Sequence, residues 1–377
     1  MHAHTLIVDD AGLAPLAEAL ASTSELALDT ESNSMFAYRE RLCLVQLALP
    51  RPDGDPLLAV IDPLAFPSTA AALAPLAAWL ADPAHRVLLH GGEYDVAILK
   101  RELGVSPARV FDTQAAAMML GIERTGFGSL VEIFCDVTLA KSHQQHDWKR
   151  RPIPQAALAY ALDDVAYLVP LARRLEAIVA EADLVEEVDI ACAAVAAARP
   201  HAPRDPGEAF WRVIGAARPS EEDLARLFAL WRWRESLAEA RDVPPARLVP
   251  NEVLHRVAAR RPTSAADLEG LGLPRDVVQR ACQPLIDLFA TPLAALDRPP
   301  ARARSARPDP QVRARESRLK RWREDEARQR GVSPQVVLPA RALEHLATHG
   351  LGGLETAPQL GPKRLARYGE ALRALIE

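Results

Sequence analysis

The sequence predicts an α/β domain, in which helices flank a mixed sheet, followed by two all-α domains. Three observations support this fold class. Short apolar runs alternate with Ala/Leu-rich helical stretches through residues 1–200. Prolines cluster directly after this region and indicate a domain break. Beyond the break, two blocks that contain Trp-Arg-Glu repeat each other at a constant spacing of 89 residues.

Strands and helices alternate through the first 200 residues. Four apolar or β-branched runs predict strands at Leu26–Asp29, Leu42–Ala48, Leu57–Ile61 and Val87–Leu89. Further stretches predict helices at Ala11–Ala21, Ala70–Leu80, Asp95–Arg101, Thr113–Leu120 and Gln155–Ala180. The Asp53-Gly54 pair fits a hairpin turn between the second and third strands. Such a hairpin is antiparallel, so the sheet is expected to be mixed.

The second half of the chain has the pattern of a tandem duplication. Pro200, Pro203, Pro206 and Gly207 end a first domain that we place at residues 1–200. Five landmarks then recur without a gap: Trp233-Arg234-Glu235 and Trp322-Arg323-Glu324, Val243 and Val332 with a proline two residues after each, Pro250 and Pro339, Leu254 and Leu343, and Leu271-Gly272 and Leu360-Gly361. We therefore place helical domains at residues 217–293 and 313–377, joined by a Pro-, Arg- and Ala-rich linker at 294–312. Trp233 and Trp322 are expected in their cores.

The bulk composition narrows the class of protein. The chain has 377 residues, of which 49% are hydrophobic and 25% charged, as expected for two or three folded domains. Its four cysteines lack metal-ligand spacing and are expected to be buried, reduced thiols, which fits the cytoplasm. The N-terminal residues lack the pattern of a signal peptide, and no apolar run reaches the length of a membrane span. We therefore expect a cytoplasmic protein without membrane contact. We further expect a monomer without an obligate protein partner.

Residues 301–330 form a basic segment in an otherwise acidic protein. They hold eleven basic and five acidic residues, whereas the whole chain has a net charge of −5. Such a local excess of positive charge suits contacts with a nucleic-acid backbone, and Arg313 and Arg321 are candidates for them. The alternative is that this segment is only a solvated linker and helix face.

Acidic residues at two places carry a chemical signal. Asp29 and Glu31 are two apart at the end of a predicted strand, so their side chains point to the same face. Two carboxylates on one face suit Mg²⁺ or Mn²⁺, although a strand-end pair that faces solvent explains the same pattern. Tyr160 and Asp164 are four apart in a predicted helix and share one face, whereas Asp163 points elsewhere.

Together with a third segment, these residues resemble the motifs of a known enzyme family. Asp95 lies within His90-Gly-Gly-Glu-Tyr-Asp95, after a predicted strand, where an acid could also simply favour a helix N-terminus. With Asp29-Thr30-Glu31 and Tyr160-Ala-Leu-Asp-Asp164-Val, it is similar to the Tyr-containing 3′–5′ exonucleases named for their Asp-Glu-Asp-Asp metal ligands. Two further stretches are similar to ribonuclease D, Phe111-Asp112-Thr113-Gln114 and Asp147-Trp148-Lys-Arg-Arg151-Pro152. The C-terminal repeats resemble the HRDC domain.

The resemblance covers nearly the whole chain and implies a ribonuclease H-like exonuclease domain followed by two HRDC domains. It implies hydrolytic 3′–5′ exoribonuclease activity that releases nucleoside 5′-monophosphates, with 3′-extended tRNA precursors among the substrates. It also implies two divalent ions, Mg²⁺ or Mn²⁺, with Asp29 between them, Glu31 and Asp164 completing one site, and Asp95 supporting the other. Tyr160 would orient the attacking water, since a neutral phenol is a poor base at neutral pH.

Two alternatives remain open at this level. The same catalysis could act mainly on DNA, because no residue identifies a contact with a 2′-hydroxyl group. The chain could also be an inactive adaptor that carries nucleic-acid-binding repeats on a nuclease fold. Lys141 and Arg151 flank the third motif and are candidates for phosphate contacts, in addition to Arg313 and Arg321.

Overall fold

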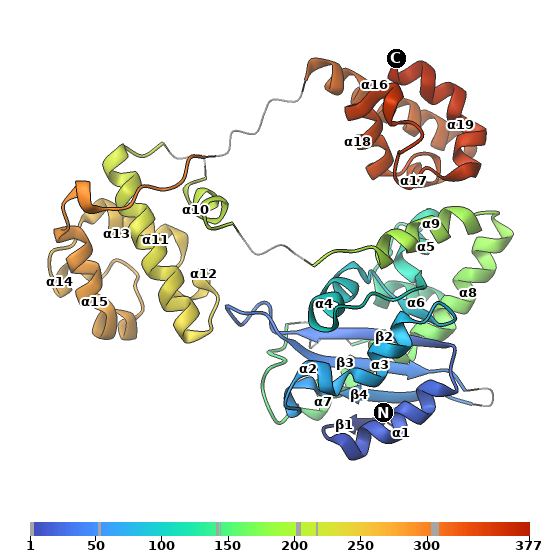
Figure 1. The fold of residues 1–377 in the computed structure, drawn as a ribbon, viewed down its shortest axis with the longest axis horizontal. Helices are drawn as coiled ribbons and strands as arrows, with labels where there is room; N and C mark the ends of the chain where they lie inside the picture. Colours follow the sequence, from blue (N-terminus) through green and yellow to red (C-terminus); the bar gives the residue numbers. More distant parts are fainter. Residues whose placement is uncertain are drawn as a thin grey trace. The chain divides into compact units, whose positions relative to one another are not determined.

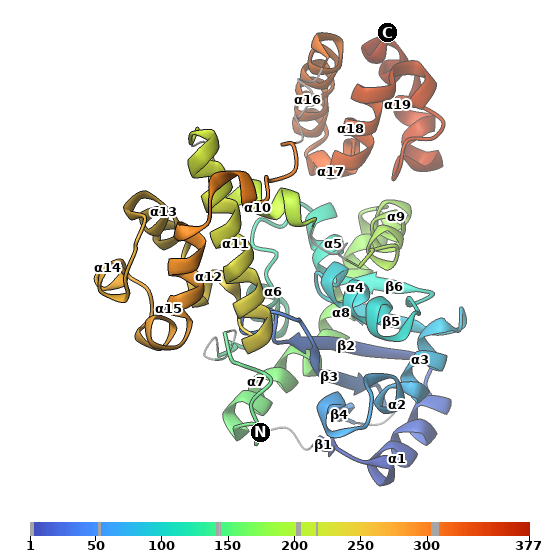
Figure 2. The same cartoon turned by 60° about the vertical axis from the view of Figure 1, so that its left-hand side comes forward.

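A computed structural model describes residues 4–51, 54–140, 143, 145–200, 205–215, 218–302 and 309–377. The chain forms two compact units, whose elements are labelled in Figures 1 and 2. The first unit comprises Met1–Ser32, Leu42–His201 and Arg307–Glu377, and the second comprises Asn33–Arg41 and Ala202–Ala306. The C-terminal repeat therefore belongs to the same unit as the α/β domain.

A six-stranded mixed sheet forms the centre of the α/β domain. Its strands are β1 His4–Ile7, β2 Glu25–Ser32, β3 Leu42–Leu49, β4 Leu57–Ile61, β5 Arg86–Leu89 and β6 Val110–Asp112. They follow the spatial order β1-β4-β3-β2-β5-β6. β3 is antiparallel to both β2 and β4, and the other neighbouring strands are parallel. The expected mixed sheet is confirmed, while Asp53 of the proposed hairpin turn lies outside the described residues.

Helices cover both faces of this sheet (Figure 1). One face packs against α1 Asp10–Ala21, α2 Thr69–Ala72, α3 Ala74–Ala81 and α4 Glu93–Leu103, with the turn η1 Pro63–Ala65 leading into α2. The other face packs against α5 Thr113–Met119, α6 Phe127–Cys135, α7 Gln155–Ala166, α8 Leu168–Glu181 and α9 Val185–Ala196. Along β2, Leu26 and Leu28 belong to the first layer and Ala27 to the second. This strand is therefore buried on both sides.

Two predicted helices are each divided in the structure. The predicted helix Ala70–Leu80 is interrupted at Leu73, and Pro75 lies in the first turn of the second piece. The predicted helix Gln155–Ala180 is interrupted at Tyr167, and Pro170 lies at the start of α8. Proline lacks the backbone N–H of a helix interior but is tolerated in a first turn, so each helix restarts there. The strands β1 and β6, with four and three residues, are too short for periodicity to reveal.

The duplication is visible in the helix bounds. α11 Glu221–Arg241, α12 Pro245–Leu248 and α13 Asn251–Arg260 correspond, at the spacing of the sequence landmarks, to α16 Pro310–Arg330, α17 Pro334–Val337 and α18 Ala340–His349. One contact is repeated as well, because Arg234 donates to the carbonyl of Val249 and Arg323 donates to that of Leu338. Both Trp-Arg-Glu tryptophans pack against their cores, as expected.

The last helices of the two repeats also correspond, but their bounds differ. In the first repeat α14 Ala265–Leu268 and α15 Arg275–Ala290 follow α13, while α10 Pro206–Ile214 precedes the repeat and η2 Leu293–Ala295 lies at its end. The second ends with η3 Gly350–Gly353 and α19 Gly361–Ile376. Among the described residues, no helix combines the length and the apolar character that a membrane crossing requires.

Each repeat packs against its own partner within its unit. In the second unit, the loop 33–41 between β2 and β3 contacts the first repeat, where Arg39 pairs with Glu239 at 2.5 Å. In the first unit, α19 of the second repeat contacts α9, where Lys363 pairs with Asp183 at 2.9 Å and Glu187 at 3.4 Å. The two copies therefore share a fold but use different side chains for their contacts.

Candidate active site

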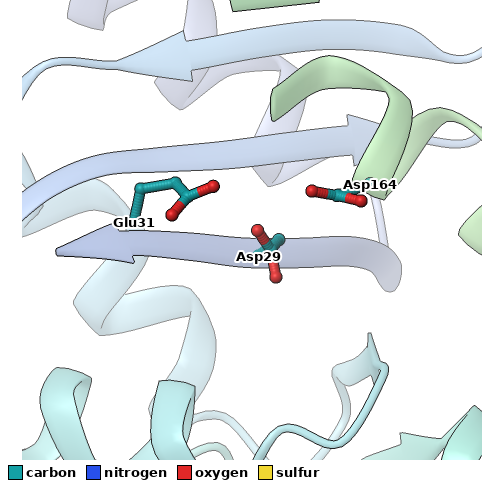
Figure 3. Close-up of side chains that lie close together, drawn as sticks. All are labelled: Asp29, Glu31 and Asp164. Atoms are coloured by element: carbon teal, nitrogen blue, oxygen red, sulfur yellow. The ribbon is translucent and has the colours of Figure 1, made fainter. Parts of the chain in front are cut away.

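The end of β2 presents two carboxylates to the helical layer that contains α7. Because side chains alternate along a strand, Asp29 and Glu31 point to the same side as Ala27, whose contacts are with that layer. Figure 3 shows these two side chains on one strand, with Asp164 facing them from a helix. One carboxylate oxygen of each of the three residues lies within 4.8 Å of the others. We call these three residues the carboxylate cluster.

Helix α7 brings a phenol to this cluster. Its apolar side buries Ala157, Leu158, Ala161, Leu162 and Val165 and thereby fixes the helix on the sheet. Tyr160 lies one turn before Asp164, and its hydroxyl hydrogen-bonds the Asp164 carboxylate. Asp163, the neighbouring acid, is not part of the carboxylate cluster. The hydroxyl of Tyr160 is therefore adjacent to the cluster.

Asp95 approaches β2 from the opposite helical layer. It lies in the first turn of α4 and is only 7% exposed. Its Oδ1 accepts a hydrogen bond of 2.5 Å from Oγ1 of Thr30, the residue between Asp29 and Glu31. Although Asp95 is outside the closest grouping, its charge raises the pKa of both Asp29 and Glu31. The structure thus places all four predicted acids around the end of one strand.

The turn that leads into α4 is fixed by a third strand. Asp112, at the end of β6, accepts a hydrogen bond of 2.8 Å from the backbone N–H of Gly92. Gly91 has a φ of 63°, a conformation that favours glycine. At Gly92 a Cβ atom would lie 2.5 Å from the side chain of Leu89. The two glycines and Asp112 therefore determine where α4 begins, and so where Asp95 lies.

Burial and mutual repulsion perturb all four acids. Burial is the largest cause at each, and neighbouring carboxylates add to it. The pKa of Asp29 lies well above its usual range, and that of Glu31 is raised to about 9. The pKa of Asp164 is raised to about 7 and that of Asp95 to about 6. Without a cation, the site therefore holds protons that free carboxylic acids would release.

This set of donors fits divalent metal ions. In the described part of the chain, no Lys or Arg forms an ion pair with any of the four acids. The hydroxyls of Thr30 and Tyr160 lower the pKa values of Asp95 and Asp164, but they carry no charge. Buried carboxylates without a cationic partner are unfavourable. Hard oxygen ligands grouped in this way are those that Mg²⁺ and Mn²⁺ prefer.

The four basic residues proposed for substrate contact lie in different environments. Lys141 lies outside the described residues. Arg151 donates to both carboxylate oxygens of Asp62, at 2.5 and 2.6 Å, and also to the carbonyl of Cys43. It therefore ties the segment before α7 to β3. Arg313 and Arg321 are exposed on α16. Their roles as phosphate contacts stay predictions.

Two side chains that shape the site are not among the predicted site residues. Thr30 lies within the first motif, but its partner Asp95 is 65 residues away, so no local spacing reveals the contact. Asp112 lies in the Phe111-Asp112-Thr113-Gln114 stretch that is similar to the family, although that similarity assigns it no role. The structure supplies the role, because Asp112 holds the turn before α4.

Comparisons with known proteins agree with this geometry. Residues 5–180 match the family model described as 3′–5′ exonuclease, and residues 223–288 and 313–376 match the HRDC domain. The chain is 33% identical to ribonuclease D of Acidiphilium cryptum, over 80% of this chain and 76% of that protein. It is 34% identical to ribonuclease D of Escherichia coli, over 72% of this chain and 70% of that protein. The crystal structure of the Escherichia coli protein, described as an exoribonuclease involved in structured RNA processing, matches with a TM-score of 0.66 and 28% identity, over 99% of this chain and 98% of the other.

Proposed function

Because this chain belongs to the ribonuclease D family of 3′–5′ exoribonucleases, we propose that it trims structured RNAs, above all tRNA precursors with 3′ extensions, using two divalent ions. The reaction hydrolyses the last phosphodiester bond and releases nucleoside 5′-monophosphates. The observation that carries the proposal is the carboxylate cluster, which has no Lys or Arg partner among the residues that the structure describes and lies beside Tyr160. The description of the Escherichia coli relative supports the choice of substrate class.

The residues around β2 have two proposed roles, metal binding and orientation of the attacking water. Asp29, Glu31 and Asp164 would hold one ion, and Asp95 would support a second beside Asp29. Two such ions, when bound, supply positive charge to the entering and leaving oxygens of the phosphodiester. Tyr160 orients the attacking water through its hydroxyl, which already hydrogen-bonds Asp164. The chain itself therefore contributes ligands and orientation, and its described residues place no cation at the site.

Binding of the RNA body is assigned to basic residues away from the acidic site. Arg313 and Arg321 are exposed on α16, and guanidinium groups suit phosphate contacts. Lys141 and Arg151 are further candidates beside the third motif, although Arg151 would have to share its guanidinium with Asp62. We propose that the protein acts as a cytoplasmic monomer. This division allows a protein with a net charge of −5 to hold a polyanion.

A 5′-labelled tRNA precursor with a short 3′ extension tests the proposal. We expect stepwise shortening from the 3′ end with Mg²⁺ or Mn²⁺, and none with EDTA. A DNA strand of the same sequence should be shortened more slowly. Preferential shortening of DNA would show that the protein acts mainly on DNA. Binding without shortening under any metal would identify an adaptor.

A matched pair of variants makes this experiment specific to the site. Asp164→Asn removes a member of the carboxylate cluster, whereas Asp163→Asn changes the adjacent acid outside it. We expect the first variant to lose shortening and the second to retain it. Equal loss in both would contradict the assignment of Asp164 as the ligand.

A further inference from the structure

Thr30 lies between Asp29 and Glu31 on β2, and its side chain points to the opposite face of the sheet. Asp29 and Glu31 face the layer of α7, so the side chain of Thr30 faces the layer of α4. Its Oγ1 donates to Oδ1 of Asp95 at 2.5 Å. Both residues are 7% exposed, so little water competes for this bond. The strand thus carries two carboxylates on one side and, through Thr30, binds the carboxylate of Asp95 on the other.

The turn before α4 sets where that helix begins, but strand pairing does not tie Asp95 to the acidic end of β2. The parallel pairing of β2 with β5 ends at Ala27 and Leu88, before the strand reaches its acidic residues. Beyond that point, side-chain hydrogen bonds connect β2 with the first turn of α4. One is the bond from Thr30 to Asp95, and the other joins the hydroxyls of Ser32 and Tyr94 at 2.5 Å. The Asp95 carboxylate also accepts a hydrogen bond from the backbone N–H of Thr30, so both the side chain and the backbone of Thr30 hold it against β2.

We propose that Thr30 is a positioning residue, whose hydroxyl holds Asp95 at the distance from Asp29 that a second divalent ion requires. This inference rests on the two-ion function proposed above. Asp29 and Asp95 repel each other, and a hydroxyl can hold the carboxylate against that repulsion without neutralising it. A Lys or Arg at this position would instead compete with the ion. Thr30 acts through Asp95 and does not itself bind the ion.

Two substitutions separate the hydroxyl from the shape of the side chain. Thr30→Val keeps the branched shape but loses the donor, and Thr30→Ser keeps the donor but loses the methyl group. Thr23→Val is a matched control, since it removes a hydroxyl that donates to the carbonyl of Ala19 in the same domain. Circular dichroism and thermal unfolding of each full-length protein establish that it is folded.

Metal binding is measured first, on RNA-free protein, by titration with Mn²⁺ followed by electron paramagnetic resonance. We expect Thr30→Val to weaken binding of one Mn²⁺ about tenfold or more, as is typical when an outer-shell partner of a ligand is lost. Thr30→Ser and Thr23→Val should bind as the wild type does. If Thr30→Val binds Mn²⁺ as Thr23→Val does, the proposal is wrong. If Thr30→Val does not fold, weak Mn²⁺ binding by folded Thr30→Ser overturns it, and wild-type binding supports it.

Kinetics on a labelled oligoribonucleotide give the second readout. Thr30→Val should lower kcat about tenfold at a fixed low metal concentration, leave KM for RNA within about twofold, and recover partly at high metal concentration. A merely structural role would not produce this metal-dependent recovery. Failure of the wild type to shorten RNA would count against the proposed function, whereas the Mn²⁺ titration tests Thr30 independently of RNA.

Discussion

Strand β2 carries acidic residues at both of its ends, and the two ends differ in how the acids are paired. At its first residue, Glu25 forms ion pairs with Arg86 and Arg173. At its other end, Asp29 and Glu31 face a third carboxylate, and no Lys or Arg pairs with them among the described residues. The same strand therefore combines a neutralised acid with an acidic group that is not neutralised.

The difference separates residues that serve the fold from residues that serve the reaction. A paired acid such as Glu25 holds neighbouring elements together through its ion pairs with Arg86 and Arg173. An unpaired group raises the pKa values of its members and lowers the stability of the metal-free protein. Such a group is tolerated because a bound cation can compensate it. Variants at the two ends of β2 should accordingly affect different measured quantities.

The largest effect is expected for Asp29→Asn. Loss of this proposed ligand should lower turnover about 10³-fold or more, because charge stabilisation by a metal ion lowers the barrier by several kcal/mol. The same variant should raise the stability of the metal-free protein at neutral pH, since it removes an acid whose pKa is raised by burial and by neighbouring carboxylates. Single-turnover kinetics and urea unfolding in EDTA measure the two quantities. If Asp29→Asn lowered both activity and metal-free stability, Asp29 would stabilise the fold, as we expect of Glu25.

The free energy of unfolding should depend on both pH and bound metal, because both act on the acids at the end of β2. Free Asp and Glu release their protons near pH 4, whereas in the folded protein the pKa values of Asp95, Asp164 and Glu31 are about 6, 7 and 9. Between these limits the folded state binds more protons than the unfolded state, so metal-free stability falls as pH rises from 5 to 9. At pH 8, Mg²⁺ at a hundred times its Kd should restore about 2.7 kcal/mol. Unfolding of the α/β domain in EDTA and in Mg²⁺, at pH 5 and pH 8, measures both effects. Equal stability at both pH values in EDTA would contradict this account.

Tyr160→Phe tests whether the hydroxyl beside the carboxylate cluster contributes to turnover. The substitution keeps the packing of α7 but removes the hydroxyl that hydrogen-bonds Asp164. We expect turnover to fall about 10- to 100-fold, because misplacement of a reacting group by about 1 Å has an effect of this size. Affinity for RNA should change little, and gel-shift titration in Ca²⁺ measures it separately. Unchanged turnover would remove Tyr160 from the reaction.

Glu25→Gln tests the paired end of the strand. The substitution removes the charge that pairs with Arg86 and Arg173, while Glu176 still pairs with Arg86. We expect a loss of about 1–2 kcal/mol in the free energy of unfolding, typical of a hydrogen bond to a charged group. Turnover should stay within about twofold of the wild type at a temperature where both proteins are folded. If Glu25→Gln lowered turnover but not stability, the assignment of Glu25 to the fold would be wrong.

Local spacing predicts those parts of the site that lie on one element. The two-residue spacing of Asp29 and Glu31 and the four-residue spacing of Tyr160 and Asp164 place each pair on one face, as in the structure. The same reasoning predicts β2 to β5 and the mixed sheet. These features depend on the period of a strand or a helix, which a single sequence shows directly.

Contacts between distant elements leave no such period in the sequence. The bond between Thr30 and Asp95 exists only because β2 and β5 become neighbours. Arg151 meets Asp62 across 89 positions, an ion pair that no local spacing in the sequence reveals, while its predicted phosphate contact stays a prediction. The packing of the second repeat against α9 depends on Lys363, where the first repeat has Pro274. Duplication predicts two similar folds, but it does not predict that only one copy joins the unit of the α/β domain.

The smallest effect is expected for an acid that is paired, exposed and close to the site. Glu93 begins α4 two residues before Asp95 and pairs at 3.2 Å with Arg341 of the second repeat, with 59% and 58% of the two side chains exposed. Arg341→Ala should therefore change the free energy of unfolding by less than about 1 kcal/mol and turnover by less than about twofold. Urea unfolding and multiple-turnover kinetics measure the two values, with Arg373→Ala on α19 as an exposed control. A tenfold loss of turnover in Arg341→Ala without a loss of stability would mean that the Arg341–Glu93 pair positions α4 for catalysis. Paired acids could then no longer be assigned to the fold alone.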